Sequence, residues 1–293
     1  MTVIYDRTFE GERPLYGISD SRVEKCLFGE GESPLKECRN IEVAGCTFGW
    51  KYPLWYCRDV SVDDTVWQEM ARAGVWYSHG VRIKDSVIHA PKNFRRCSAL
   101  SLSNVKFTKA LETLWSCSGV KMRDVVVRDG DYFAMNSSDI EVDGLDLEGN
   151  YSFDGCSNVM VRNARLISKD AFWNCRNVTV YDSHIEGEYL GWNSENLTFV
   201  NCTIESDQGM CYINNLRMID CRLTNTTLAF EYSSVDAKID SDIVSVLNPS
   251  SGTITCGRIG ELIIEPDRVD PSKTVITATS IGTRKDRPEW LIT

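Results

Sequence analysis

The chain has 293 residues, and its 42 Asp and Glu against 32 Lys and Arg give a formal net charge of −10. This acidic balance argues against nucleic acids and anionic membranes as main partners. The first 16 residues contain no apolar signal core, and no run approaches the ~18 apolar residues of a membrane span, so we expect a soluble cytoplasmic protein.

A repeat of about twenty residues begins near Ile18 and continues to about Tyr232. Four consecutive copies read CSGVKMRDVVVRDGDYFAMN, SSDIEVDGLDLEGNYSFDG, CSNVMVRNARLISKDAFWN and CRNVTVYDSHIEGEYLGWN. A period of this size indicates the stacked coils of a solenoid. We expect about 12 coils in a single domain of residues 1–293, with an N-terminal cap at 1–17, regular coils at 18–232, and irregular coils with a C-terminal cap and tail at 233–293.

Three residues after the start of each copy come two apolar residues around a polar one, as in Val120 and Met122 around Lys121, and this alternation predicts a strand with one buried face. Two residues later comes Gly, Asn or Asp, as at Asp124, because these residues tolerate a left-handed corner. A second short strand and a third, aromatic-rich segment complete the coil, often through another corner such as Asn136. Three short strands per coil predict an all-β parallel β-helix, with the right-handed form favoured. A leucine-rich-repeat horseshoe is the nearest alternative, but leucine is scarce at its required positions.

The twelve cysteines include no CxxC pair, and most of them recur at two coil positions. The first position holds Cys38, Cys57, Cys97, Cys117, Cys156 and Cys175, and the second holds Cys26, Cys46, Cys202 and Cys221. We interpret these columns as buried free thiols that fill small core positions. The three histidines lack ligand partners at usable spacing, so we expect no metal site and no cofactor.

The position two residues before each coil start is unusual because tryptophan recurs there. This row contains Trp55, Trp76, Trp115, Trp173 and Trp192, and Arg95 and Asp154 occupy the same row. The preceding row is uniformly apolar or small, so by alternation the tryptophan row should face outward. Five outward tryptophans exceed scattered surface apolarity. The alternative is that they point inward and that the charged strip beside them is a solvated edge.

Tryptophan rings beside charged groups suit the stacking and hydrogen bonding of sugars. The candidate substrate-binding residues are Trp55, Trp76, Trp115, Trp173, Trp192, Tyr132 and Tyr189. The candidate catalytic residues are Asp131, Asp154, Asp170, Glu188, Arg95, Lys169 and Tyr151. Carboxylates on adjacent coils would lie ~5 Å apart, near the separation in retaining glycosidases, whereas an arginine or lysine could serve as a lyase base or a carboxylate clamp.

Several segments resemble an uncharacterised bacterial family of the pectin-lyase-like superfamily. They are GESPLKE at 31–37, WKYPLWY at 50–56, ETLW at 112–115, GDYF at 130–133, GNYSFDG at 149–155, SKDAFWN at 168–174, GEYLGWNS at 187–194 and LAFEYS at 228–233. The resemblance implies a right-handed β-helix, and the superfamily implies polysaccharide lyases, polygalacturonase-type hydrolases and epimerases. We therefore expect a carbohydrate-active protein, a lyase or glycoside hydrolase that acts on an oligosaccharide or polysaccharide in a groove along one face. The alternatives are a non-catalytic solenoid that binds a glycan or a protein, and a structural scaffold.

Overall fold

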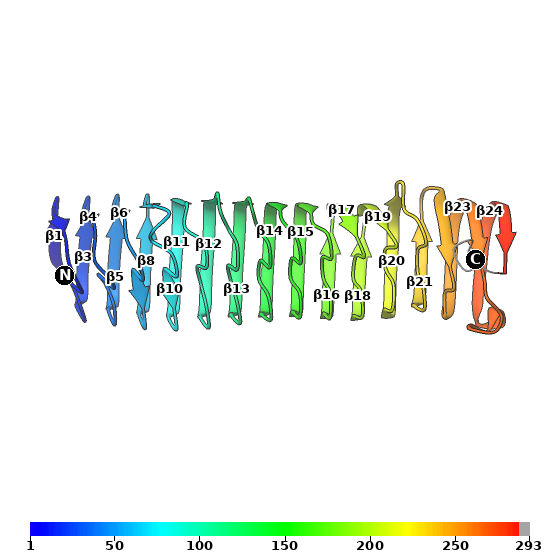
Figure 1. Cartoon of the computed structure of the whole chain (residues 1–293), viewed down its shortest axis with the longest axis horizontal. Coiled ribbons are helices and arrows are strands. Elements are labelled where there is room, and N and C mark those ends of the chain that lie inside the picture. The colour runs from blue at the N-terminus through cyan, green and yellow to red at the C-terminus, as the bar shows by residue number, and fades with distance from the viewer. Residues whose placement is uncertain (287–293) are drawn as a thin grey trace. The chain divides into compact units, whose positions relative to one another are not determined.

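The computed structural model describes residues 1–286 and consists almost entirely of β-structure. The chain divides into two units, Met1–Gly149 (unit 1) and Asn150–Thr293 (unit 2). Within each unit, successive strands pair in parallel with the strands one coil further along, as Figure 1 shows. The fold is a right-handed parallel β-helix, as the repeat predicted, and it has about 15 turns.

Short strands make up both units. Unit 1 contains β1 (Thr2–Tyr5), β2 (Thr8–Phe9), β3 (Ser19–Glu24), β4 (Leu27–Phe28), β5 (Arg39–Ala44), β6 (Thr47–Phe48), β7 (Leu54–Trp55), β8 (Arg58–Asp63), β9 (Val66–Trp67), β10 (Val75–Trp76), β11 (His79–Ile88), β12 (Ser98–Phe107), β13 (Ser118–Val127) and β14 (Ser138–Glu148). Unit 2 contains β15 (Ser157–Ile167), β16 (Arg176–Tyr181), β17 (His184–Glu188), β18 (Glu195–Val200), β19 (Thr203–Asp207), β20 (Asn214–Leu223), β21 (Ser234–Ile239), β22 (Ile243–Leu247), β23 (Ser251–Ile263), the 3₁₀ turn η1 (Pro271–Lys273) and β24 (Thr274–Lys285).

The apolar column and the corner column lie where the repeat predicted them. Val120 of β13 lies opposite Ile140 of β14, and both side chains are buried. Asp124 and Gly144 follow with φ values of 52° and 76°, which place both in the left-handed region. The same conformation recurs at Gly45, Asp64, Asp85, Asn104, Asn163, Asp182, Asn201 and Asp220. This Gly, Asn or Asp column therefore bends each coil from the one that contains Gly45 to the one that contains Asp220, and Lys25, with a φ of 53°, takes the corner in the coil before them.

The structure refines the prediction of three short strands per coil. In β11 to β15 and in β20, the strands on either side of the corner merge into one bent strand, because coil-to-coil pairing continues past the left-handed residue. In the regular coils, all of which the structure describes, the third, aromatic segment is a regular strand in β7 and β10. In later coils left-handed residues alternate there, as at Glu112, Leu114 and Ser116. A left-handed residue at every second position interrupts the extended backbone of a strand.

The predicted number of coils, about 12, was too low, because strand pairing extends into both predicted caps. In the N-terminal segment, β1 pairs with β3 from Thr2 to Tyr5. Beyond residue 233, β21 pairs with β23, and β23 pairs with β24. The spacing of paired residues changes there, from Val235↔Gly252 to Gly252↔Thr274, so side-chain columns no longer reveal the coils. The last part of the predicted tail, residues 287–293, lies outside the described residues.

The cysteine columns lie in the core, as predicted. All twelve cysteines are free thiols, and all are buried. Burial raises the pKa of the Cys46 thiol to about 11, and burial also raises the pKa of Cys175 well above its ordinary value. The thiolate is the form that reacts with thiol reagents, so these groups are protected both by burial and by protonation.

We therefore expect a disulfide reagent at pH 8 to label few of the twelve thiols in the native protein and all twelve in denaturant. Absorbance of the released thiolate measures the number labelled. Rapid labelling of most thiols in the native protein would show that the columns are open to solvent, and mass evidence for bonds between coils would contradict the assignment of free thiols.

Candidate functional site

The outward row of unit 1 is a continuous stack of four half-buried side chains, Trp55, Trp76, Arg95 and Trp115. The Trp55 and Trp76 rings lie parallel, with centroids 5.0 Å apart and 6° between their planes. The Arg95 guanidinium lies between the next two rings, 4.7 Å from the Trp76 centroid and 4.6 Å from the Trp115 centroid. Aromatic stacking and cation–π attraction therefore stabilise these coils against one another.

The indole N–H groups of this row bind the backbone of the following coil. Trp55 Nε1 donates to the Ala73 carbonyl at 2.6 Å, and Trp115 Nε1 donates to the Tyr132 carbonyl at 2.7 Å. The ring faces inside the stack are covered by their neighbours, so it is the ring edges that reach solvent. The row faces outward as alternation predicted, but a sugar ring cannot lie flat on an interior member of the stack while the stack is intact.

Besides the two rings, Arg95 contacts a carboxylate. Its Nη2 atom lies 3.2 Å from Glu112 Oε2, and Lys92 Nζ lies 3.2 Å from the other Glu112 oxygen. The buried Nε atom of Arg95 has no hydrogen-bond partner in the described part of the chain. Arg95 therefore serves first as a part of the stack, and its head group is already neutralised by Glu112.

A cavity of about 580 Å³ in unit 1 contains another of the predicted residues, Asp131. The residues that line this Asp131 cavity are Pro91, Lys109, Leu111, Arg128, Asp129, Asp131, Glu148 and Gly149. Pro91 and Leu111 provide apolar surface, and Leu111 is 39% exposed. The other side chains bring two cations and three carboxylates around that surface.

The backbone places Asp131 and Glu148 on neighbouring coils. The Gly130 amide donates to the Glu148 carbonyl at 2.9 Å, and Arg128 Nε lies 3.6 Å from Glu148 Oε2. Equivalent positions on neighbouring coils are separated by about 4.8 Å. Tyr132 follows Asp131, is 37% exposed, and meets Trp115 edge to face at 6.4 Å, so the Asp131 cavity adjoins the tryptophan stack.

In unit 2, the predicted aromatic residues again contact one another. Trp173 and Trp192 are half-buried, with ring centroids 6.0 Å apart and 37° between their planes. Trp173 Nε1 donates to the Tyr189 carbonyl at 2.8 Å, and the Tyr189 ring lies 5.7 Å from Trp192. The wider angle between the two indoles means that this row is stacked less tightly than Trp55 and Trp76.

Asp170 is a buried carboxyl group beside these rings. The residue is 1% exposed, and its Oδ1 atom has no hydrogen-bond partner among the described residues. Burial raises the pKa of Asp170, and the negative charges of Glu188 and Asp154 add to that rise. The positive charge of Lys169 and the hydrogen bond from Tyr151 act in the opposite direction. This combination is typical of a carboxylic acid that is held protonated at higher pH than usual.

The remaining predicted residues of unit 2 are paired. Lys169 Nζ lies 2.9 Å from Glu188 Oε2 and 5.7 Å from the centroid of the Tyr189 ring. Asn174 Nδ2 donates to Asp154 Oδ1 at 3.0 Å. Asp170 therefore lies beside a salt-bridged glutamate, and the five predicted catalytic residues of unit 2 form one cluster, which we call the Asp170 cluster.

The structure groups the fourteen predicted residues by unit. Arg95, Asp131, Tyr132, Trp55, Trp76 and Trp115 belong to unit 1, and Tyr151, Asp154, Lys169, Asp170, Trp173, Glu188, Tyr189 and Trp192 belong to unit 2. Glu112, which neutralises Arg95, was not among the predicted site residues, and neither were Arg128 and Glu148, which line the Asp131 cavity. Arg128 directly follows β13 and Glu148 ends β14, so both lie where the variable loop begins and no column repeats. The signal in the sequence that could have identified Arg128 and Glu148 is their opposite charge at equivalent positions of neighbouring coils.

Two general features of the described residues bear on chemistry. Within residues 1–286, no group of three or more His, Cys, Asp or Glu side chains is arranged to hold a metal ion. Over the same residues, no helix has the length and apolarity needed to cross a membrane.

The structure is similar to PfbA, a surface adhesin of Streptococcus pneumoniae, at 10% identity and a TM-score of 0.41, over 96% of this chain and 82% of that one. It is also similar to a mutant tailspike protein of E. coli bacteriophage HK620 in complex with a hexasaccharide, at 10% identity and a TM-score of 0.42, over 91% and 66%. The A-module of the mannuronan C-5 epimerase AlgE4 from Azotobacter vinelandii matches at 10% identity and a TM-score of 0.29, over 98% and 89%.

No curated protein matches the sequence. A family model described as "Protein of unknown function (DUF3737)" matches residues 2–277, which is nearly the whole chain. The protein therefore belongs to the DUF3737 family.

Proposed function

We propose that this protein binds an oligosaccharide in the Asp131 cavity. The observation that supports this is the composition of the cavity, in which Pro91 and Leu111 provide apolar surface among five charged side chains. Sugars present apolar C–H faces surrounded by hydroxyl groups, so they require both kinds of contact. A volume of about 580 Å³ accommodates a few sugar units, and the edges of Trp115 and Tyr132 extend the surface beyond it.

The proposal predicts that Leu111→Ala and Asp131→Asn each weaken glycan binding about 5–10-fold, because one removes apolar contact and the other removes a charged acceptor. Isothermal titration calorimetry with maltohexaose, cellohexaose and xylohexaose measures the affinity. Val66→Ala and Asp63→Asn are matched controls, because both residues are exposed in unit 1 and outside the cavity. If no hexaose binds, or if the cavity variants bind as the controls do, the Asp131 cavity is not a glycan site.

A second candidate function is glycoside hydrolysis or lyase chemistry at the Asp170 cluster. The observation that favours it is the buried Asp170 Oδ1 atom, which has no hydrogen-bond partner within residues 1–286 and belongs to a carboxyl group whose pKa is raised by burial. A protonated acid beside an ionised carboxylate such as Glu188 is the arrangement that glycosidases use, with the acid proton passing to the glycosidic oxygen as its bond to the anomeric carbon breaks. Tyr151 donates to Asp170, so access to the carboxyl requires the Tyr151 side chain to move.

The twelve free thiols are consistent with a reducing compartment, so a cytoplasmic location remains our proposal.

A further inference from the structure

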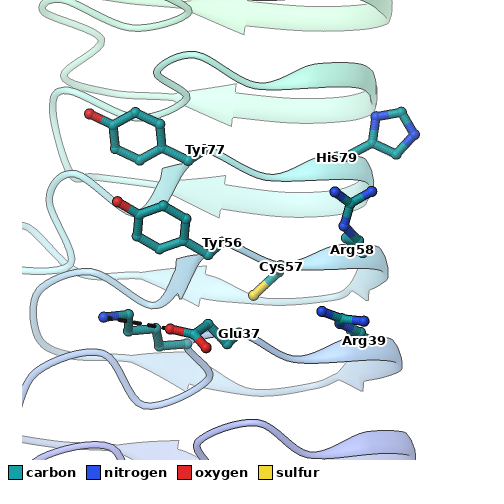
Figure 2. A pocket seen from close by; sticks show the side chains of 8 residues that line it. Glu37, Arg39, Tyr56, Cys57, Arg58, Tyr77 and His79 are labelled. Carbon is teal, nitrogen blue, oxygen red and sulfur yellow. Dashed lines mark ion pairs between the residues drawn. The ribbon is translucent and has the colours of Figure 1, made fainter.

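Unit 1 contains a separate cavity of about 490 Å³, on other coils than the Asp131 cavity. The side chains that line it are Lys36, Glu37, Arg39, Tyr56, Cys57, Arg58, Tyr77 and His79 (Figure 2). We propose that this arginine–tyrosine pocket binds the oxyanion, a carboxylate or a phosphate, of a small hydroxylated organic ligand. The pocket shares no lining residue with the Asp131 cavity, so this proposal is independent of the glycan site.

One wall of the pocket is a column of basic side chains on three strands that lie side by side in the sheet, one from each of three successive coils. Arg39 of β5 lies in register with Arg58 of β8, which lies in register with His79 of β11. Neighbours in such a column are about 4.8 Å apart. The next two coils place Ser98 and Ser118 in the same column. The basic wall is therefore confined to the coils that form the pocket.

The two arginines of this wall have no ionic partner in the described part of the chain. Among the described residues, neither Arg39 nor Arg58 has a side-chain hydrogen bond or ion pair. Arg22 on β3 shows the usual arrangement, with Glu24 and Glu42 each 2.9 Å from its guanidinium. Like charges side by side on neighbouring strands are destabilising. An oxyanion between the two guanidinium groups would remove this repulsion and match their planar forked geometry.

The opposite wall consists of two tyrosine rings. Tyr56 and Tyr77 are 47% and 38% exposed, and their rings stack 5.0 Å apart at 8°. Lys36 Nζ lies 5.5 Å from the centroid of Tyr56, and the Arg96 guanidinium lies 6.0 Å from that of Tyr77, so cations hold the rings in place. The rings offer an apolar edge and a phenolic hydroxyl to the organic part of a ligand.

The backbone between the walls forms the floor. Figure 2 shows Cys57 between the tyrosine side and the arginine side. Cys57 is buried, and Tyr56 before it is left-handed, with a φ of 58°. Because alternate side chains point in opposite directions, Tyr56 and Arg58 both emerge from this floor toward solvent.

Glu37 at the rim limits the charge of the ligand. Its Oε2 atom accepts a hydrogen bond from the Tyr16 hydroxyl at 2.7 Å, and its Oε1 atom lies 3.8 Å from Lys36 Nζ. A fixed carboxylate repels a second anionic group but accepts hydrogen bonds from hydroxyls. The pocket is therefore suited to a ligand with one oxyanion and several hydroxyl groups, such as a sugar acid or a sugar phosphate.

Calorimetric titration with galacturonate, inorganic phosphate and galactose tests the proposal. We expect galacturonate or phosphate to bind with a Kd near 1 mM, and galactose, which lacks the oxyanion, to bind at least about tenfold more weakly. Arg39→Gln with Arg58→Gln should weaken the binding of the anion at least about tenfold. Neither arginine has a side-chain partner within residues 1–286, so the double variant should fold, and Arg58→Gln alone provides a milder test. Binding of phosphate alone would identify a phosphate ligand, and binding of galacturonate alone would identify a sugar acid.

Arg82→Gln with Arg123→Gln is the matched control, because it removes the same charge from exposed positions of unit 1 outside the pocket. This control should retain anion binding. Tyr56→Ala with Tyr77→Ala should weaken galacturonate binding more than phosphate binding. The proposal is wrong if the Arg39 and Arg58 double variant binds normally, if the control loses binding equally, if galactose binds as well as galacturonate, or if neither anion binds at about 50 mM.

Discussion

Phe172→Ala is expected to lower the free energy of unfolding by about 3–5 kcal/mol, since it deletes a large ring from a packed core. Phe172 is fully buried in unit 2, and its ring stacks on Phe153 with centroids 5.2 Å apart and 18° between planes. The deletion leaves a cavity that the neighbouring coils fill only in part, because the hydrogen bond from the Phe172 amide to the Ser152 carbonyl, at 2.9 Å, holds the backbone of the two coils in register.

Urea unfolding followed by circular dichroism measures this loss. Met160→Ala is the control in the same unit, because Met160 is 41% exposed and its truncation should cost less than about 0.5 kcal/mol. In a solenoid each coil contacts only its neighbours, so the Phe172 variant should also broaden the transition if the coils around it unfold first. A loss below about 1 kcal/mol for Phe172→Ala would show that the ring is not part of a tight core.

Asp170→Asn is expected to have opposite effects on stability and on turnover. Burial raises the pKa of Asp170, so the folded state holds its proton more tightly than the unfolded state does. The stability that this proton contributes is complete below the unfolded pKa near 3.9 and is lost as pH rises through the folded pKa. Asparagine has no carboxyl group to ionise, so it avoids the cost of a buried negative charge. Relative to the native protein, the variant should therefore become more stable as pH rises from 4 toward 7.

If the Asp170 cluster is catalytic, the same substitution should reduce turnover of a cleavable glycan by about 100-fold or more, because asparagine cannot donate the acidic proton. Thermal melting at several pH values and reducing-end release from a glycan panel measure the two effects. Asp182→Asn is the matched control, because Asp182 is exposed in the same unit, lies outside the Asp170 cluster and accepts a hydrogen bond from Asn201 Nδ2 at 2.7 Å. Unchanged turnover in Asp170→Asn would falsify the catalytic role, and a relative loss of stability toward pH 7 would contradict the burial argument.

The fold followed from the sequence because a solenoid repeats its local rules. A left-handed corner restricts the residue type at every turn, so Asp124, Asn163 and Asp182 mark the coils in the sequence. Inward positions alternate with outward ones, so the place of the cysteine columns in this alternation was enough to predict that they are buried. These requirements involve one residue and its immediate chain neighbours, so sequence alone contains them.

The contacts of each outward side chain depend on the side chains of the neighbouring coils. The sequence placed Trp55 and Trp76 on one outward row, but only the coil-to-coil register showed that their faces cover each other. The same register brings residues from three strands together in the arginine–tyrosine pocket, and it leaves Arg39 and Arg58 without a side-chain partner among the residues that the structure describes. Side-chain contacts between coils depend on loop length and rotamer, which the repeat does not specify. The sequence by itself therefore determined the coil conformation and the core positions. The tertiary structure decided which outward side chains are covered or paired by their neighbours and which are open to a ligand.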